Sequence, residues 1–155
     1  HTRSLVPSRG LGDVYKRQVP GFSYPDLDGR HRHSDEFGDK VVVLNFWATW
    51  CTPCRKETPE FVALQEAFAG DVQFIGIAID DEEPVREFAD TFEMNYPVLL
   101  GDIEAVSLSR RLGNRYEGLP FTVVAAPGGK VVLRHAGSLE REKLETILRD
   151  LTGAG

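Results

Sequence analysis

The stretch Asn45-Phe46-Trp47-Ala48-Thr49-Trp50-Cys51-Thr52-Pro53-Cys54 holds both cysteines of the 155-residue chain, separated by two residues. The apolar run that leads into it, residues 41–46, is typical of a strand buried on both faces. Apolar residues after it recur with a helical period: Phe61, Leu64, Ala67 and Phe68. The sequence therefore predicts that a strand ends just before Cys51 and that a helix begins at residues 51–53.

A cysteine at the start of a helix is well placed for redox chemistry. Free backbone N–H groups and the positive end of the helix dipole stabilise a thiolate there, so we expect the pKa of the Cys51 thiol to fall below the value of about 8.5 for a free thiol. Cys54 lies about one turn further into the helix and is expected to be more buried. The pattern predicts that Cys51 attacks a substrate disulfide and that Cys54 resolves the mixed disulfide.

Two other interpretations of the cysteine pair stay open. The cysteines could be unreactive core residues, or they could bind copper with His135 as a third soft ligand. Two cysteines are too few for a disulfide scaffold or a structural zinc site, and C-x-x-C beside a βαβ unit favours a redox pair. We therefore expect no metal site. His31 and His33 have no metal-ligand partners nearby in the sequence and are predicted to be surface residues.

The rest of the chain predicts a single α/β domain. Turn signals in residues 22–36 indicate a hairpin or edge region, and the β-branched run 72–79 completes a βαβ unit. The further elements expected are a helix with Pro84 at its first position, a strand at 96–100, a helix at 103–112, an antiparallel pair at 121–126 and 130–135 around the turn 127–129, and a last helix with Ser138 as N-cap.

Charge and hydropathy exclude two classes of function. The formal net charge is −6, so the chain lacks the basic footprint that nucleic-acid binding requires. No apolar run approaches the roughly 18 residues that a transmembrane helix needs. The acidic run 80–83 is interpreted as the start of a helix and not as a cation site, because acids are favoured at helix N-termini.

Residues 1–18 are treated separately. They show no apolar periodicity, and the run Asp13-Val14-Tyr15-Lys16-Arg17-Gln18 resembles the in-frame translation of an adapter used in sequencing libraries. We interpret residues 1–18 as non-native or as a disordered tail, and assign the folded domain to residues 19–155. A native signal peptide or membrane anchor would then be missing from the sequence.

The segment 45–57 resembles the active-site stretch of the thioredoxin superfamily, and most of all its TlpA/ResA-like branch of bacterial extracytoplasmic thiol–disulfide reductases. The resemblance spans residues 20–151. Gly118-Leu119-Pro120, before the strand that begins at Phe121, is similar to the cis-proline loop of this family, and residues 96–112 fit its strand–helix insertion. The resemblance implies an α/β thioredoxin fold with a central mixed sheet flanked by helices.

The resemblance also implies a substrate-binding surface. Pro120 is expected in cis, facing the disulfide, and the Leu119 backbone is expected to pair with an extended substrate peptide. Trp50, Thr52 and Pro53 complete this surface, with Trp50 partly exposed. Two further residues are assigned to structure: Trp47 is expected in the core, and Pro59 is expected to kink a continuing helix unless the helix begins anew there.

One departure from thioredoxin concerns proton transfer. Thioredoxin has a buried aspartate six residues before its first cysteine, whereas this chain has Asn45, which cannot accept a proton. In the ResA-like branch a glutamate three residues after the second cysteine lies close to the disulfide, and Glu57 occupies that position. We hypothesise that Glu57 modulates the pKa values of the cysteines and exchanges a proton with Cys54. Alternatively, Glu57 is a solvated helix residue paired with a nearby base.

These inferences predict a thiol–disulfide oxidoreductase, acting as a reductase on cysteines of partner proteins without an organic cofactor or metal. By resemblance it would be a periplasmic monomer supplied with electrons by a membrane protein, and its substrates would belong to cytochrome c maturation or to copper-site assembly of an oxidase. The alternatives are a thiol peroxidase on the same fold and a non-catalytic copper-binding module.

Overall fold

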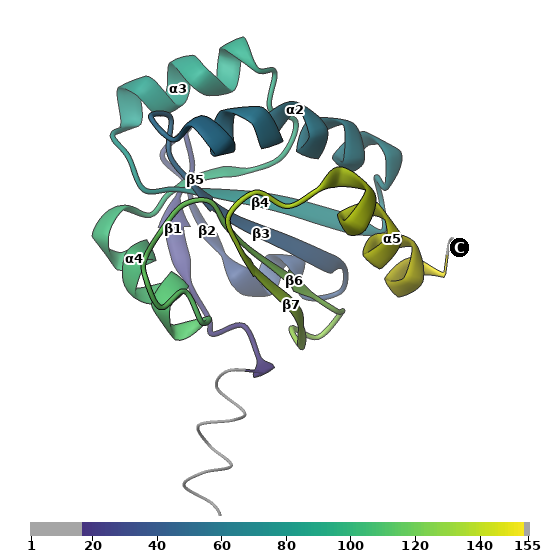
Figure 1. Cartoon of the computed structure of the whole chain (residues 1–155). Coiled ribbons are helices and arrows are strands. Elements are labelled where there is room, and N and C mark those ends of the chain that lie inside the picture. Colours follow the sequence, from purple (N-terminus) through teal and green to yellow (C-terminus); the bar gives the residue numbers. More distant parts are fainter. Residues whose placement is uncertain (1–16, 154–155) are drawn as a thin grey trace, which may run out of the picture.

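A five-stranded mixed sheet forms the middle layer of the structure, a computed structural model that describes residues 17–153 (Figure 1). The strand order is β5-β4-β3-β6-β7. β3 pairs in parallel with β4, and β4 with β5, whereas β6 runs antiparallel to both β3 and β7. The strands are β3 (Val41–Trp47), β4 (Val72–Ala78), β5 (Val98–Leu100), β6 (Phe121–Ala125) and β7 (Val131–Ala136). The predicted central strand is therefore confirmed.

Helices cover both faces of this sheet. One face packs against α2 (Thr52–Ala67), α3 (Glu82–Thr91) and α5 (Arg141–Thr152). The other face packs against α4 (Asp102–Arg111), the hairpin of β1 (Ser23–Pro25) and β2 (His31–His33), and the 3₁₀ helix η2 (Ser34–Phe37). The mixed sheet flanked by helices, the N-terminal hairpin and the strand–helix insertion are thus all present.

The apolar run of β3 serves both faces because successive side chains of a strand point to opposite sides. Val43 packs with Phe61 of α2, and Leu44 packs with Leu108 of α4. All four side chains are at most 1% exposed. A strand covered by helices on both sides needs apolar residues at nearly every position, which explains the near-continuous run in the sequence.

Two helix starts differ from the sequence-based predictions. Pro84 is the third residue of α3 and not the first, because α3 begins at Glu82 after Asp81. Ser138 does not cap α5, which begins at Arg141 with Glu140 as its N-cap residue. The reason for the second difference is tertiary: the N–H of the buried Leu139 donates a hydrogen bond to a side chain of α2, and Glu140 stays in the extended conformation.

The helix α2 runs through Pro59 without interruption, so the alternative that a new helix begins at Pro59 is wrong. Proline cannot donate the usual helical hydrogen bond, and Pro59 lies on the exposed side of α2, where the helix tolerates it. After the helix ends, Gly70 adopts a φ of +97°, which favours glycine and lets the chain turn into β4.

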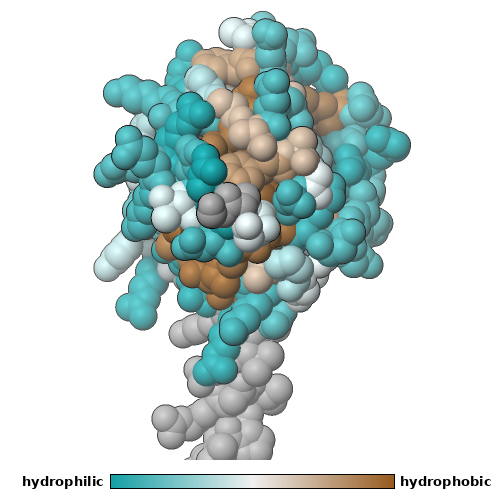
Figure 2. Space-filling model, turned by 90° about the vertical axis from the view of Figure 1, so that its right-hand side faces the viewer, coloured by the Kyte–Doolittle hydropathy of each residue, from teal (hydrophilic) through white to brown (hydrophobic). Residues whose placement is uncertain are grey.

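The face of the molecule on the side of α5 carries a band of apolar surface bordered by hydrophilic side chains (Figure 2). Apolar residues of β7 and α5 are only partly buried where they pack on the core: Leu133, Ile147 and Leu151. Two other apolar residues of α5, Leu144 and Leu148, are fully covered.

The chain joins the fold at Gln18 and Val19. Gln18 forms an antiparallel bridge with Lys130, and the N–H of Val19 donates to the carbonyl of Gly129 at 2.9 Å. The interpretation of the N-terminal segment falls mostly on residues 1–16, which lie outside the described residues, and so remains a prediction. Within residues 17–153, no helix combines the length and apolar character that crossing a membrane requires.

Candidate active site

The two cysteines lie where β3 gives way to α2. Cys51 is the N-cap residue of α2, with an extended backbone (φ −91°, ψ 111°), and its Sγ accepts a hydrogen bond from the Cys54 N–H at 3.3 Å. Pro53 stands in the first turn of the helix, where its missing N–H does no harm. The predicted position of Cys51 at a helix start is confirmed, and this N-terminus offers donors to a thiolate.

Cys51 and Cys54 form a disulfide with a Cα–Cα distance of 5.3 Å. The two sulfur-bearing residues differ in exposure: Cys51 is 6% exposed and Cys54 is 1% exposed. The preceding residue, Trp50, is 68% exposed, while Thr52 and Pro53 are also on the surface. A partner can therefore approach Cys51 across an exposed indole ring, whereas Cys54 is shielded.

The Gly118–Pro120 loop packs against the apolar cluster that contains the disulfide. The Leu119–Pro120 peptide bond is cis, and the partly buried Leu119 packs on the cluster that contains both cysteines. Two hydrogen bonds fix the loop: the Asn114 side chain donates to the Gly118 carbonyl at 2.9 Å, and the Gly137 N–H donates to the Pro120 carbonyl at 2.8 Å. The structure thus brings together segments that are about 65 residues apart in the sequence.

Glu57 is a buried residue of α2, with 2% of its surface exposed. Its Oε2 accepts a hydrogen bond from the Leu139 N–H at 2.6 Å, and its Oε1 has no hydrogen-bond partner among the described residues. The alternative of a solvated Glu57 paired with a base is wrong, because the side chain is almost fully buried and forms no ion pair within residues 17–153.

Burial raises the pKa of the Glu57 carboxyl to about 7, because the charged form loses its hydration. The Leu139 N–H lowers this pKa, the charge of Glu60 raises it, and the Asn45 side chain lowers it. Burial, and then the nearby charge of Glu57, raise the pKa of the Tyr96 phenol. A carboxyl group one helical turn from Cys54 thus titrates near neutral pH, which suits proton exchange with a thiol.

Trp47 is 1% exposed and lies in the core, as predicted, with its ring 4.8 Å from that of Phe88. Its Nε1 is buried without a hydrogen-bond partner among the described residues. A side chain at Gly76 would place its Cβ 2.9 Å from this nitrogen, so the glycine makes room for the indole. The aromatic side chains next to the cysteines are therefore closely packed.

Several contacts of the site were not predicted from the sequence. Asp80, interpreted only as a helix-start acid, accepts hydrogen bonds from both the N–H and the hydroxyl of Thr49. The Arg55 guanidinium lies over the rings of Phe88 in α3 and of Phe92 just after this helix. The partner of Glu57, the Leu139 N–H, is a backbone group 82 residues away, and no side-chain pattern marks such a group.

The copper interpretation finds no support in the geometry. Within residues 17–153, no group of three or more His, Cys, Asp or Glu side chains is arranged to hold a metal ion. His135 lies on β7, and its Nε2 forms a hydrogen bond with the Ser138 carbonyl at 2.7 Å. His31 and His33 are exposed on the N-terminal hairpin, as predicted.

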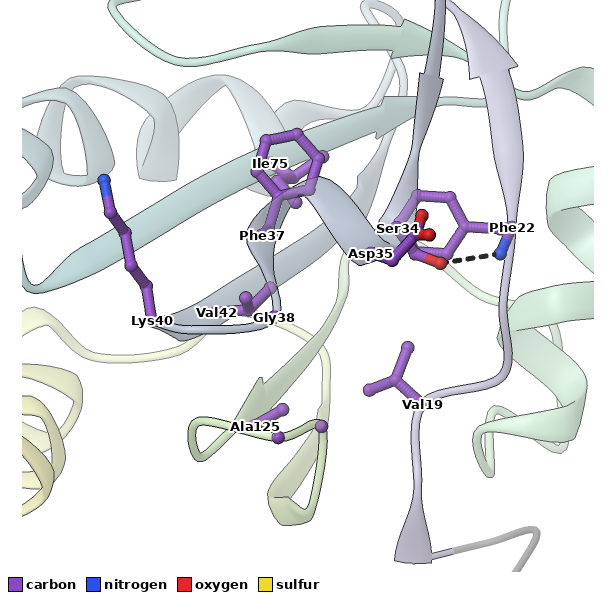
Figure 3. A pocket seen from close by; sticks show the side chains of 12 residues that line it. Val19, Phe22, Ser34, Asp35, Phe37, Gly38, Lys40, Val42, Ile75 and Ala125 are labelled. Atoms are coloured by element: carbon purple, nitrogen blue, oxygen red, sulfur yellow. Dashed lines mark hydrogen bonds between the residues drawn. The ribbon is translucent and has the colours of Figure 1, made fainter.

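A separate pocket of about 270 Å³ lies at the other end of the sheet (Figure 3). Val42 near the start of β3 and Ala125 at the end of β6 contribute to its lining, together with apolar side chains of Val19, Phe22 and Phe37. The cysteines follow the opposite end of β3, so this pocket takes no part in their chemistry.

A C-x-x-C disulfide at the start of a helix, together with a cis-proline loop on a five-stranded mixed sheet, defines a thiol–disulfide oxidoreductase of the thioredoxin fold. Comparison with known proteins agrees. The chain is 31% identical to the thioredoxin-like protein YneN of Bacillus subtilis over 136 residues, covering 85% of this chain and 77% of that protein. It is 30% identical to the thiol-disulfide oxidoreductase ResA of Bacillus cereus, covering 88% and 78%.

A solved structure gives the same result for the fold. A thiol:disulfide interchange protein of the thioredoxin family from Chlorobium tepidum superposes with a TM-score of 0.80 at 27% identity, covering 88% of this chain and 97% of that one. The sequence model of the AhpC/TSA family matches residues 15–134. The chain belongs to the AhpC/TSA family, and its curated relatives include thiol–disulfide oxidoreductases named ResA.

Proposed function

We propose that this oxidoreductase works as a reductase, with Cys51 as nucleophile and Cys54 as resolving thiol. The thiolate of reduced Cys51 attacks a disulfide of a partner protein, forms a mixed disulfide and releases the first substrate thiolate. The Cys54 thiolate then attacks the Cys51 sulfur, releases the second substrate thiolate and leaves the Cys51–Cys54 disulfide. The observation that carries this assignment is the placement of Cys51 at the N-cap of α2 with Cys54 shielded behind it.

Glu57 is proposed to exchange the proton of Cys54. Its carboxyl group is buried one turn along α2 and has a pKa of about 7, so at neutral pH both of its protonation states are populated. In the ionised state it accepts the thiol proton before Cys54 attacks, and afterwards it returns a proton to the departing substrate thiolate. The reaction proposed needs no organic cofactor and no metal.

The substrate is proposed to lie across Trp50, Thr52 and Pro53 and to pair with the Leu119 backbone. Trp50 offers an exposed aromatic surface beside Cys51, and Leu119 packs on the cluster that holds the disulfide. An extended peptide that pairs with a backbone segment gains main-chain hydrogen bonds whatever its sequence. This arrangement suits protein substrates rather than a small molecule enclosed in a pocket.

The setting proposed is extracytoplasmic, and the chain is proposed to act as a monomer that receives electrons from a membrane protein. These proposals rest on the similarity to ResA-like proteins. The candidate substrates are cysteines of cytochrome c or of a copper-binding oxidase component. Cysteine pairs in either would need to be kept reduced until haem or copper is bound.

The reduction potential of the Cys51–Cys54 couple tests the direction of exchange. Equilibration of the protein in glutathione or dithiothreitol buffers at pH 7 gives this value. A potential near or below about −220 mV fits a reductase, and a potential near −120 mV, as in DsbA, would make the protein an oxidant of its partners. Failure to form a reversible disulfide would remove the enzymatic proposal altogether.

A thiol peroxidase on the same fold is the second candidate, and a threonine and an arginine do flank the cysteines. However, the Thr49 hydroxyl donates to Asp80, and the Arg55 guanidinium lies over the rings of Phe88 and Phe92. Both groups are thus engaged away from the Cys51 sulfur. Peroxide turnover that outpaces disulfide turnover under the same conditions would favour the peroxidase.

A further inference from the structure

A groove of about 370 Å³ opens between the first turns of α2 and the helix α3. Two of its lining residues stand close to the cysteines in the sequence. Thr49, two residues before Cys51, forms one wall, and Arg55, the residue after Cys54, forms another. Phe88, on the α3 side of the groove, also packs in the cluster that contains both cysteines. The function proposed above uses none of these groove residues.

The floor of the groove is aromatic and fixed in position. The Phe88 and Phe92 rings stack with their centroids 4.0 Å apart and their planes inclined by 9°. The Arg55 guanidinium carbon lies 5.5 Å and 5.6 Å from the two centroids, within the range of cation–π attraction. Arg55 also donates a hydrogen bond to the Thr49 carbonyl at 3.3 Å. The groove is therefore formed before any partner arrives.

The wall next to the disulfide is fixed by Asp80. One carboxylate oxygen accepts the Thr49 N–H at 2.9 Å and also the Thr49 hydroxyl, and the other accepts the Asp81 N–H at 2.7 Å. These bonds hold the loop that carries the exposed Trp50. A groove with fixed walls loses little conformational entropy when a side chain enters it.

Negative charge dominates the α3 side of the groove. Residues 80–90 contain six acidic side chains and one arginine, Arg86, which pairs with Glu82 at 2.7 Å. Within the described part of the chain, Glu83 and Glu87 are exposed and form no ion pair. Arg55 and Glu87 are the charged residues of the groove lining, and the other acids of this segment lie outside the lining. The acidic segment 80–90 beside the groove therefore attracts a cation.

We propose that this groove docks a lysine or arginine side chain adjacent to the reacting cysteine of a protein partner. The aliphatic part of such a side chain packs beside Arg55 on the apolar lining of the groove, and its charged end reaches Glu87, with Glu83 one helical turn away. Charge complementarity favours a basic substrate segment over an acidic or a purely apolar one. The inference rests on the proposed function and adds the chemical class of the preferred substrate.

The test uses two disulfide-bonded peptides that differ only in carrying lysine or glutamate beside the cysteine. With the reduced protein at low salt, we expect KM for the lysine peptide to be lower by about threefold or more, with kcat unchanged, and the difference to shrink at high salt. The double variant Glu83→Lys/Glu87→Lys should abolish or invert this preference. Equal KM values for the two peptides with the unmodified protein would overturn the proposal.

The matched control is Glu66→Lys/Asp150→Lys, which changes the net charge equally at exposed positions near the far ends of α2 and α5. An equal effect of this control would show that overall charge, and not the groove, sets the preference, and would also overturn the proposal. Hydroxyethyl disulfide, a small neutral substrate, distinguishes failure of the docking proposal from failure of the proposed function. If it is exchanged normally while the peptides show no charge preference, only the docking proposal fails; if it is not exchanged, the proposed function fails.

Discussion

The two faces of the sheet are built from the same strands but do different work. On the side of α4 and the hairpin, β3 contributes Leu44 and Phe46 to a cluster of apolar and aromatic side chains. The alternate residues of β3, Asn45 and Trp47, point to the side of α2 and α3. There Asn45 lies near Glu57, and Trp47 packs in the cluster of the two cysteines. The two buried side-chain atoms without a hydrogen-bond partner in residues 17–153, Trp47 Nε1 and Glu57 Oε1, both belong to this second face.

The difference shows how a small domain separates stability from chemistry. Buried polar atoms without a hydrogen-bond partner cost free energy, and the two found among residues 17–153 lie on the face where a shifted pKa is useful. On the other face, buried polar side chains such as Ser109 of α4 are hydrogen-bonded, and burial of apolar area stabilises the fold. Alternation along a single strand achieves this separation, so neighbouring substitutions in β3 should have different consequences.

The largest effect is expected at the cysteines. Cys51→Ser should lower the rate of disulfide exchange by on the order of a thousandfold or more, because the nucleophile is lost. Cys54→Ser should instead leave a long-lived mixed disulfide on Cys51, since the resolving thiol is gone. Mass spectrometry after incubation with a disulfide substrate measures both. Equal trapping at Cys54 in the Cys51→Ser variant would reverse the assigned roles.

On the apolar face, Phe46→Ala should destabilise the fold by about 3–5 kcal/mol, because a side chain with no exposed surface leaves a cavity. The intrinsic exchange rate of the molecules that remain folded should change little. Urea unfolding gives the stability, and exchange with a small disulfide at a temperature well below the unfolding transition gives the rate. A large loss of rate without loss of stability would break the separation of the two faces.

Glu57 should make stability depend on pH. Its pKa is about 7 in the folded state against 4.5 for the ordinary group, so the folded protein binds the proton more tightly. The oxidised protein should therefore be most stable relative to Glu57→Gln below about pH 4.5, and should lose up to about 3 kcal/mol as the pH rises through about 7. Urea titrations of both proteins from pH 4 to pH 8 measure the difference.

Parallel stability curves for wild type and Glu57→Gln would contradict the raised pKa. Rescue of the pH profile in a Glu57→Asp variant would show that the carboxyl group itself is responsible. Thiol alkylation of Cys54 against pH, measured on the same variants, tests the proton exchange: superimposable profiles would remove Glu57 from the mechanism while leaving its effect on stability intact.

The smallest effect is expected at Gly76. A methyl group there would meet Trp47 Nε1 at 2.9 Å and Tyr96 Cε1 at 3.3 Å, so Gly76→Ala should cost about 1–3 kcal/mol through overpacking. Because Trp47 must move, its fluorescence should shift as well. An unchanged spectrum with unchanged stability would show that the packing around Trp47 has space for an additional methyl group.

Much of the fold could be predicted from the sequence. The strand–helix boundary at the cysteines, the βαβ unit, the hairpin around Pro127-Gly128-Gly129 and the buried stripe of α5 all follow from hydrophobic period and turn residues. Ser138 was the wrong cap because a hydrogen bond from Leu139 to α2 outweighed the local preference for serine.

The sequence by itself determined the reactive element. A C-x-x-C pair between an apolar strand and an amphipathic helix places Cys51 at a helix N-terminus, and that geometry is local. Tertiary structure decided the surroundings of the pair: the burial of Glu57 against Leu139, the packing of Leu119 on the cluster that contains the disulfide, and the clamp of Asp80 on Thr49. These contacts join residues 31 to 82 positions apart, and only the packing of the helices on the sheet brings them together.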